Sequence, residues 1–155
     1  MITKTIKGNL LDAFDRGAVG VIAHQCNCFC NMGSGIAPQI AKRYPNVSKA
    51  DQETRQGDAS KLGTFTKAWV NHGHSKGIVY NLYGQFRYGG QRMQTNYDAL
   101  AAALKAMQRD LIKLDKADCI VGLPLIGCGL GGGDWEVVSK IINDVFTNEV
   151  HIYVL

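Results

Sequence analysis

Two glycine-dense segments, far apart in the chain, constrain this sequence more than any of its other features. The first is His-Gln-Cys-Asn-Cys-Phe-Cys-Asn-Met-Gly-Ser-Gly-Ile at residues 24–36, and the second is Pro-Leu-Ile-Gly-Cys-Gly-Leu-Gly-Gly-Gly-Asp-Trp at residues 124–135. Each follows an apolar run typical of a β-strand and precedes a segment with helical spacing. Glycine lets the backbone approach a ligand closely, and N–H groups at the start of a helix favour anions. The pair predicts a cleft that holds a diphosphate from two sides.

Around these two segments, apolar runs alternate with stretches of helical spacing. Strands are expected at residues 2–8, 19–24, 64–70, 78–83, 119–125 and 150–155. Helices are expected at residues 36–44, from Ser48 toward Gly57, after the candidate N-cap Thr95 and after the candidate N-cap Asp134. The turn-forming connection 71–77 predicts a hairpin. This alternation predicts an α/β fold, in which a mixed sheet is covered by helices on both faces.

Composition places the chain among ordinary folded proteins. Its 155 residues fit one domain, residues 1–155, and 46% of them are hydrophobic, enough for a normal core. No apolar run approaches the roughly 18 residues that a membrane helix needs. The first residues carry charges where a signal peptide would be apolar. The net charge of +4 is scattered, which argues against a nucleic-acid surface. We therefore expect a cytoplasmic protein with no membrane partner.

Five cysteines, an odd number, cannot all pair in internal disulfides. Cys26, Cys28 and Cys30 alternate with other residues, whereas structural zinc sites add a second cysteine or histidine pair elsewhere. Cys119 and Cys128 are single and distant. We therefore expect reduced cysteines that pack as small, semi-apolar residues, with no metal and no cofactor. A cysteine nucleophile in the first glycine segment stays open as an alternative.

Common nucleotide-binding motifs do not account for the glycines. The chain has no Gly-x-x-x-x-Gly-Lys-Ser/Thr segment, which excludes a P-loop. Gly127, Gly129 and Gly131 resemble part of a dinucleotide fingerprint, but too little chain follows them for the βαβ unit and its acidic residue. The remaining interpretation is a cleft for a nucleotide diphosphate, formed by both glycine segments together.

The glycine segments and the strand ends around them carry a resemblance to a known family. The chain resembles a macrodomain, the ADP-ribose-binding α/β/α module, over essentially its whole length. The matching segments are Ile6-Lys7-Gly8-Asn9-Leu10, Ile22-Ala23-His24-Gln25-Cys26-Asn27, Met32-Gly33-Ser34-Gly35-Ile36-Ala37, Thr95-Asn96-Tyr97, Ile126-Gly127-Cys128-Gly129-Leu130 and Tyr153-Val154-Leu155. The resemblance implies a three-layer α/β/α fold with a mixed, mostly parallel sheet of about six strands.

Within the family, the chain is most similar to the branch that contains the ADP-ribose 1″-phosphate phosphatases and the terminal ADP-ribose glycohydrolases. The His-Gln-Cys-Asn-Cys stretch, the Gly-Ile-Ala that follows and Arg43-Tyr44-Pro45 favour the phosphatase. The resemblance therefore implies a hydrolase of ADP-ribose 1″-phosphate, an NAD metabolite and by-product of tRNA splicing. Two alternatives stay open: a non-catalytic ADP-ribose-binding module, and a hydrolase that removes ADP-ribose from macromolecules. We expect a monomer that binds ADP-ribose and its derivatives, with nucleic acid only as an ADP-ribosylated substrate.

The resemblance also implies where the ligand lies. Asn9 stands where macrodomains usually have an aspartate that accepts a hydrogen bond from the adenine amino group, and an asparagine carbonyl is expected to do the same. Leu155 is expected to cover the adenine. The full set of expected ligand-binding residues is Gly8, Asn9, Leu10, Asn27, Met32, Gly33, Ser34, Gly35, Ile36, Leu125, Ile126, Gly127, Cys128, Gly129, Leu130, Gly131 and Leu155.

Three residues are candidates for catalysis. His24 is expected near the distal ribose, where it could activate water or protonate the leaving oxygen; the alternative is a strand-end histidine bonded to the backbone. Asn27 is expected to orient the ribose and the phosphate. Asp134 is the only carboxylate beside the second glycine segment, and it is expected to act either as an acid or base on the phosphate side or as a helix cap.

One departure from the family matters for the chemistry. The glycohydrolase branch uses a lysine just after the strand equivalent to residues 78–83 and an aspartate in the second glycine segment. This chain has Gly84-Gln85 at the first place and Gly131 at the second. The resemblance therefore does not extend to hydrolysis through a covalent sugar–lysine adduct.

Overall fold

The computed structural model describes residues 1–73, 75–89 and 93–155. These residues form a six-stranded sheet in the order β1-β6-β5-β2-β4-β3. Neighbouring strands are parallel except for β3 and β4, which form the predicted antiparallel hairpin. The strands are β1 (Ile2–Lys7), β2 (Val21–Cys26), β3 (Phe65–Asn71), β4 (Lys76–Tyr83), β5 (Val121–Leu123) and β6 (Val150–Val154). The prediction of a mixed, mostly parallel sheet of about six strands is confirmed.

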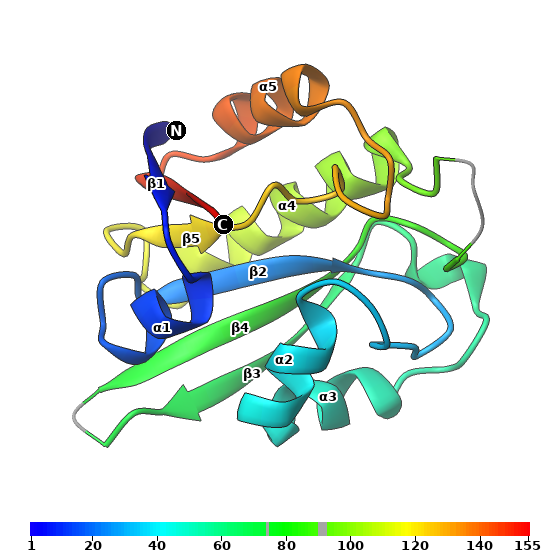
Figure 1. Ribbon diagram of the computed structural model, residues 1–155, viewed down its shortest axis with the longest axis horizontal. Coiled ribbons are helices and arrows are strands. Elements are labelled where there is room, and N and C mark those ends of the chain that lie inside the picture. Colours follow the sequence, from blue (N-terminus) through cyan, green and yellow to red (C-terminus); the bar gives the residue numbers. More distant parts are fainter. Residues whose placement is uncertain (74, 90–92) are drawn as a thin grey trace.

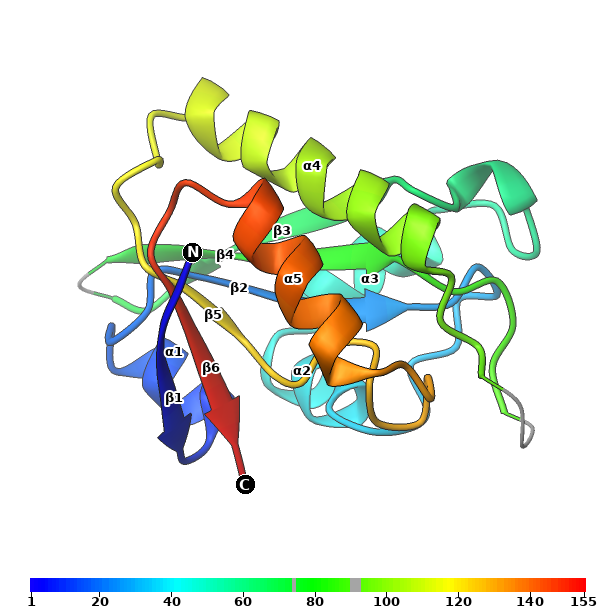
Figure 2. The ribbon, with the colours of Figure 1, turned by 90° about the horizontal axis from the view of Figure 1, so that it is seen from above.

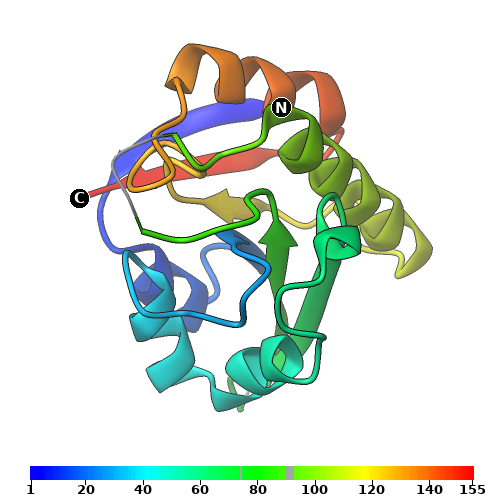
Figure 3. The same cartoon turned by 90° about the vertical axis from the view of Figure 1, so that its right-hand side faces the viewer.

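Helices cover both faces of the sheet, which gives the molecule three layers (Figure 1, Figure 3). One face carries α1, α2 and α3, and the other carries α4 and α5. The helices are α1 (Leu10–Asp15), α2 (Ala37–Arg43), α3 (Pro45–Gln52), α4 (Tyr97–Lys113) and α5 (Trp135–Val145), with a short 3-10 helix at Ala59–Lys61. None of the helices formed by the described residues is both long and apolar enough to cross a membrane.

The strands bury alternate side chains in two separate cores, because successive residues of a strand point to opposite faces. On β2, Val21 and Ala23 belong to the core with α4 and α5, whereas Ile22 belongs to the core with α1, α2 and α3. His24 lies two residues after Ile22 and therefore points to the same face. The parallel register places His24 opposite Asn81 of β4. This register brings two polar side chains together beneath an apolar layer.

Two helices begin at residues other than those predicted. The cap of α4 is Asn96 and not Thr95: the Asn96 Oδ1 accepts a hydrogen bond from the Ala99 N–H at 3.0 Å. The Thr95 hydroxyl bonds instead to a distant loop. α3 begins at Pro45, separated from the end of α2 by one residue, and not at Ser48. Proline suits the first turn of a helix because the N–H that it lacks would have no partner within the helix.

The short helix α1 has no counterpart among the predicted helices. It follows β1 after only Gly8 and Asn9, and its six residues are too few to show a helical repeat in the sequence. β5 is also shorter than expected, with three residues. The expected cap of α5 is confirmed, since the Asp134 side chain accepts a hydrogen bond from the Glu136 N–H.

The sheet brings both glycine segments to one edge. β1, β6, β5, β2 and β4 run in the same direction, so their carboxyl ends lie along the same edge. The first glycine segment follows β2, and the second follows β5, the hydrogen-bonded neighbour of β2. β1 and β6 lie side by side (Figure 2), so the residues that follow both strands end at this edge as well. Ligands of open α/β sheets bind outside this edge.

Candidate functional site

A cleft of about 1030 Å³ opens at the carboxyl edge of the sheet, at the upper end of the range for small-molecule sites. Both glycine segments, the end of β2 and the residues that follow β1 and β6 contribute to its lining. All the predicted ligand-binding residues line it, as do His24 and Asn27. The other lining residues are Leu11, Gln25, Cys26, Asn31, Ala37, Gln39, Gln85, Tyr88, Gly89, Pro124, Tyr153 and Val154.

The cleft is electrically neutral in its side chains. No lysine, arginine, aspartate or glutamate is among the described residues that line it. Its polar groups are side-chain amides, hydroxyls, thiols, one imidazole and the backbone of the glycine segments. Consecutive backbone N–H groups can form anion-binding concavities without a charged side chain. An anion bound in this cleft would therefore depend chiefly on backbone and amide donors.

The first glycine segment is held in shape by its own side chains. The Asn27 Oδ1 accepts hydrogen bonds from the Phe29 N–H at 2.9 Å and the Asn31 N–H at 3.4 Å, and its Nδ2 donates to the Asn31 carbonyl at 2.7 Å. The Asn31 Oδ1 accepts from the Gly33 N–H at 3.0 Å. Between them, Cys30 adopts a positive φ of 56°. The Asn27 amide is thus used within the segment, so any contact with a ligand comes from a side chain that is already fixed.

The second glycine segment is held by a residue far away in the sequence. The Thr95 hydroxyl donates to the Gly127 carbonyl at 2.7 Å, and the Thr95 N–H donates to the Gly131 carbonyl at 3.0 Å. The Gly133 N–H donates to the same Gly127 carbonyl at 2.8 Å. A Cβ atom at Gly131 would lie 2.4 Å from the Thr95 Oγ1, so this position requires glycine. The start of α4 therefore determines where the segment lies.

Gln25, the residue after His24 on β2, connects the strand to this second segment. Its Nε2 donates to the Thr95 Oγ1 at 2.9 Å and to the Gln85 Oε1 at 2.8 Å. A Cβ atom at Gly84 would lie 2.4 Å from the Gln25 Oε1, and one at Gly127 would lie 3.2 Å from it. Both glycines therefore leave room for the amide, which joins β2 to the loop after β4 and to Thr95, the residue that holds the second glycine segment.

His24 is buried, with a side chain that is fixed by a neighbouring strand. Its Nε2 lies 2.6 Å from the Asn81 Oδ1. The Asn81 Nδ2 donates to the Val47 carbonyl and to the Thr66 hydroxyl, both at 3.1 Å, so its Oδ1 faces the histidine as an acceptor. Nε2 therefore carries the ring proton, and Nδ1 has the lone pair. Burial lowers the pKa of His24 to about 4, although the bond to Asn81 acts in the opposite direction, and the ring is neutral at pH 7.

Asp134 lies outside the cleft lining. Its Oδ1 accepts a hydrogen bond from the Glu136 N–H at 2.9 Å, and its own N–H donates to the Tyr97 hydroxyl at 2.9 Å. The carboxylate is used as the cap of α5. Of the three candidate catalytic residues, the structure thus brings His24 and Asn27 together in the cleft and leaves Asp134 outside it.

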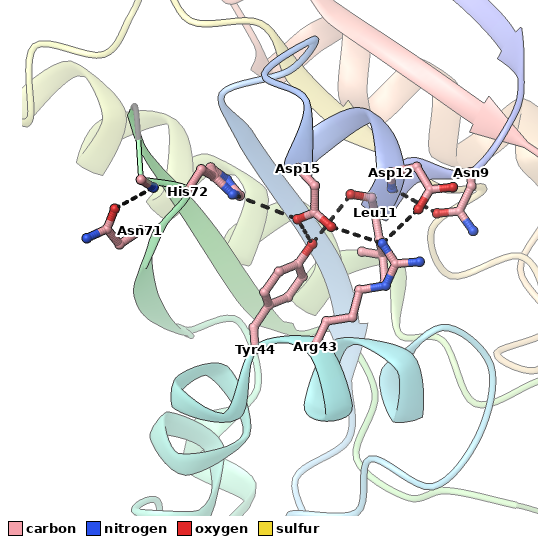
Figure 4. A network of polar contacts seen from close by, with 9 residues as sticks. Asn9, Leu11, Asp12, Asp15, Arg43, Tyr44, Asn71 and His72 are labelled. Carbon is pink, nitrogen blue, oxygen red and sulfur yellow. Dashed lines mark hydrogen bonds and ion pairs between the residues drawn. The ribbon is translucent and has the colours of Figure 1, made fainter.

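Asn9 lines the cleft and also caps α1 (Figure 4). Its Oδ1 accepts a hydrogen bond from the Asp12 N–H at 3.0 Å. The Arg43 guanidinium binds Asp12 at 2.8 Å and Asp15 at 3.0 Å, which ties α1 to α2. The oxygen that was expected to accept from adenine therefore already has one partner within the protein.

The cysteines are free thiols. Cys26 and Cys28 are buried against Tyr83, and burial raises the pKa of both thiols. A raised pKa disfavours the thiolate, which argues against either as a nucleophile. Cys30 lies outside the cleft lining. Within the described parts of the chain, no group of three or more histidine, cysteine, aspartate or glutamate side chains is placed to hold a metal ion.

Gln25, Gln85 and Thr95 were absent from the predicted site residues, although Gln25 and Gln85 line the cleft and Thr95 anchors its second glycine segment. The position of Gln25 at the end of a parallel strand was the one signal that could have indicated it. Its hydrogen-bond partners lie 60 and 70 positions further along the chain, beyond the reach of local patterns.

The fold and the glycine-lined cleft agree with comparisons to known proteins. The family model of the Macro domain matches residues 23–142, and the chain belongs to this family. An uncharacterized 17.5 kDa protein of Enterobacteria phage T4 is 34% identical over 160 residues, which cover 100% of this chain and 96% of that protein. The ADP-ribose 1″-phosphate phosphatase of Debaryomyces hansenii is 28% identical and covers 98% of each chain. The macrodomain of Thermus aquaticus DarG, at 19% identity, shares the fold with a TM-score of 0.75 over 100% of this chain and 99% of that chain.

Proposed function

We propose that the cleft binds ADP-ribose and that the protein hydrolyses ADP-ribose 1″-phosphate to ADP-ribose and phosphate. The observation that carries this proposal is a cleft that lies between two glycine segments and has no charged side chain among its described residues. The chain belongs to the Macro domain family, and it has relatives that are named for this reaction. We further propose that residues 1–155 act as one domain and as a monomer in the cytoplasm, and that nucleic acid is a partner only where it carries ADP-ribose.

Backbone donors are the proposed ligands of the diphosphate. Residues 33–36 and 127–131 line the cleft. The N–H groups of Gly33 and Cys128 bond to the Asn31 Oδ1 and to the Leu125 carbonyl, so the other N–H groups of these residues are the proposed donors. A hydrogen bond to a charged group contributes about 1.5–3 kcal/mol. Several such bonds suffice for micromolar affinity, which corresponds to roughly 8 kcal/mol. Because both segments are already fixed by internal hydrogen bonds, little ordering entropy opposes binding.

The proposed reaction uses His24 as a base. Water attacks the phosphorus of the 1″-phosphate, and the bond between phosphorus and the C1″ oxygen breaks. The His24 Nδ1 accepts a proton from the attacking water, and the resulting imidazolium returns it to the leaving oxygen. The hydrogen bond of Nε2 to Asn81 fixes the ring, and the Cys26 Sγ lies 3.9 Å from Nδ1. A base with a pKa of about 4 is weak, so we expect slow turnover.

A glycohydrolase mechanism through a lysine adduct has no support in the cleft. The described lining residues include neither a lysine nor a carboxylate side chain. The Gln85 side chain, at the place of the family lysine, bonds to Gln25 and to the Arg87 carbonyl. The proposed hydrolysis of the phosphate ester uses neither a lysine nor a carboxylate, because water is the nucleophile and His24 is the base.

Incubation with ADP-ribose 1″-phosphate tests the proposal, with phosphate release and the nucleotide product both measured. Wild type releases phosphate, and His24→Gln lowers the rate by about 100-fold or more, while calorimetry still detects ADP-ribose binding. His151→Gln is the matched control, because His151 is 6% exposed, bonds to Glu149 and lies outside the cleft lining. If ADP-ribose binds but ADP-ribose 1″-phosphate is recovered unchanged, the protein is a non-catalytic binding module. Absence of ADP-ribose binding would overturn the whole proposal.

A further inference from the structure

A buried lysine ends against the first glycine segment. Lys61, in the short 3-10 helix, is only 8% exposed. Its Nζ donates to the Cys28 carbonyl at 3.1 Å and to the Cys30 Sγ at 3.6 Å. The same nitrogen lies 4.9 Å from the centre of the Tyr83 ring. Lys61 and Cys30 both lie outside the cleft lining, so the function proposed above makes no use of this contact.

This ammonium group has no anionic partner close to it. Among the residues that the structure describes, no carboxylate oxygen lies within 4.0 Å of the Lys61 Nζ. The buried Asp51 carboxyl accepts a hydrogen bond from the Tyr83 hydroxyl at 2.7 Å, and among these residues its other oxygen has no hydrogen-bond partner. A buried cation is costly without a paired anion, so the place beside Nζ favours a group that can carry negative charge.

The Cys30 sulfur is the group that occupies this place. As a thiol, it accepts from Lys61 and has the carbonyls of Asp51 and Thr54 as acceptors, at 3.3 and 3.7 Å. The Thr54 Oγ1 lies 3.4 Å from the same sulfur and can donate to it. When Cys30 loses its proton, two donors are therefore already in position to hold the negative charge, and hydrogen bonds to a charged group are the stronger ones.

The other four cysteines lack this environment. Burial raises the pKa of the Cys26, Cys28 and Cys128 thiols, which disfavours their reactive thiolates. Cys119 is half-buried, as Cys30 is, and in the described parts of the chain no lysine donates to its sulfur. Cys119 is therefore the matched reference for Cys30.

We propose that Cys30 is a site of reversible oxidation by hydrogen peroxide, and that Lys61 holds the product as a sulfenate. The thiolate sulfur attacks one peroxide oxygen, so a sulfur–oxygen bond forms and the oxygen–oxygen bond breaks. The sulfur loses two electrons to the peroxide, and the leaving hydroxide takes up a proton and departs as water. The sulfenic acid then gives its proton to solvent, and the Lys61 ammonium donates a charge-assisted hydrogen bond to the new oxygen. Two molecules of a thiol reductant restore the thiol, with loss of water and formation of the reductant's disulfide.

Treatment of the protein with hydrogen peroxide, in the presence of a 1,3-diketone that traps sulfenic acids, tests the proposal. Peptide mass spectrometry measures the labelled fraction of each cysteine against time. In wild type, Cys30 is labelled about tenfold faster than Cys119, the effect of one hydrogen bond from a charged donor. A thiol reductant added before the diketone prevents the label. No nucleotide is present, so the result does not depend on the proposed function.

Lys61→Met removes the ammonium group and keeps an apolar side chain of similar length. It lowers the rate at Cys30 about tenfold and leaves the rate at Cys119 unchanged. Lys67→Met is the matched control, because Lys67 is half-buried and bonds to Asp110 rather than to a cysteine. Its rate at Cys30 stays at the wild-type value.

Equal rates at Cys30 and Cys119 in wild type would overturn the proposal, even if Lys61→Met fails to fold. An unchanged Cys30 rate in folded Lys61→Met, an equal loss of rate in Lys67→Met, or a label that the reductant does not prevent would overturn it as well.

Discussion

The two sides of the cleft are held in place in different ways. The first wall, residues 27–36, is closed by its own side chains, chiefly the amides of Asn27 and Asn31. The second wall, residues 124–133, has no polar side chain except the Cys128 thiol, and Thr95 ties down its backbone. One wall therefore depends on local hydrogen bonds, and the other depends on contacts between distant parts of the chain.

This difference predicts different responses to substitution. A local hydrogen bond can be lost from the first wall while the others remain, since several of them span only two to four residues. The second wall has little tolerance for added atoms at two of its glycines, because Gly131 lies against the Thr95 hydroxyl and both Gly131 and Gly133 lie against the Gly127 carbonyl. Four predictions test this comparison, from the largest expected effect to the smallest.

The largest expected effect is a change of stability with pH, caused by His24 on β2, the strand that leads into the first wall. Burial lowers the pKa of His24 from 6.5 to about 4. Between these two values, the unfolded chain binds a proton that the folded protein does not, so stability falls as the pH falls from 6.5 to 4. The loss reaches about 3 kcal/mol. Urea unfolding of wild type and His24→Gln at several pH values measures it, since the variant lacks this ionisation.

Other buried groups do not obscure this measurement. Burial raises the pKa of Asp51, so this carboxyl favours the folded state at low pH, opposite to His24. Asp51 is present in both proteins, and its contribution cancels in the difference between their stabilities. Curves of stability against pH that run parallel for wild type and His24→Gln would show that the imidazole is not held in its neutral form.

In the second wall, Gly131→Ala is expected to have the next largest effect. The new Cβ atom would lie 2.4 Å from the Thr95 Oγ1 and 2.8 Å from the Gly127 carbonyl oxygen, so the wall has to move. Such overpacking costs about 2 kcal/mol of unfolding free energy. The matched control is Gly129→Ala, where a Cβ atom meets nothing within 4 Å. Equal midpoints of chemical unfolding for both variants would show that the second wall is as adaptable as the first.

The same difference explains which features could be predicted from the sequence. The strands, the apolar stripe of α4 and the Asp134 cap rest on residues close together in the chain, so local spacing indicates them. The glycine segments were found because two short runs of glycine follow apolar strands. Their meeting at one edge follows from the parallel sheet that the alternation of strands and helices predicts.

Predictions failed where distant partners decide between local options. Thr95 and Asn96 are both good capping residues, and the sequence does not distinguish them. In the structure, the Thr95 hydroxyl bonds to Gly127, which leaves Asn96 as the cap. Gln25 was missed for the same reason, since its role appears only when Thr95 and Gln85 are brought beside it.

Thr95→Val removes the hydroxyl bond from the long-range anchor of the second wall with little change in shape, and it keeps the bond from the residue 95 N–H to the Gly131 carbonyl. The Gly127 carbonyl keeps its bond from the Gly133 N–H, and Gln25 keeps its bond to Gln85, so no buried group loses all its partners. The expected loss of stability is therefore about 1 kcal/mol. Thermal or urea unfolding measures it, and a fivefold weaker binding of ADP-ribose, about 1 kcal/mol, is expected with it.

The control for this variant is Thr5→Val on β1, an exposed site outside the cleft lining. Its stability is expected to stay within about 0.5 kcal/mol of wild type. If Thr95→Val were as stable as this control and bound ADP-ribose as tightly as wild type, the backbone hydrogen bonds, including the one from the residue 95 N–H to the Gly131 carbonyl, would be enough to fix the second wall.

The smallest effect is expected in the first wall, for Asn31→Ala. The Asn31 side chain accepts one exposed hydrogen bond, from the Gly33 N–H at 3.0 Å. The same motif recurs in the hairpin between β3 and β4, where the Asn71 side chain accepts from the Gly73 N–H at 2.8 Å. Because water can replace both bonds, each alanine variant lowers stability by about 0.5 kcal/mol. Only Asn31 lines the cleft, so ADP-ribose titration should show weaker binding for Asn31→Ala and wild-type binding for Asn71→Ala. Equal affinities would mean that the remaining bonds of Asn27 shape the first wall without help.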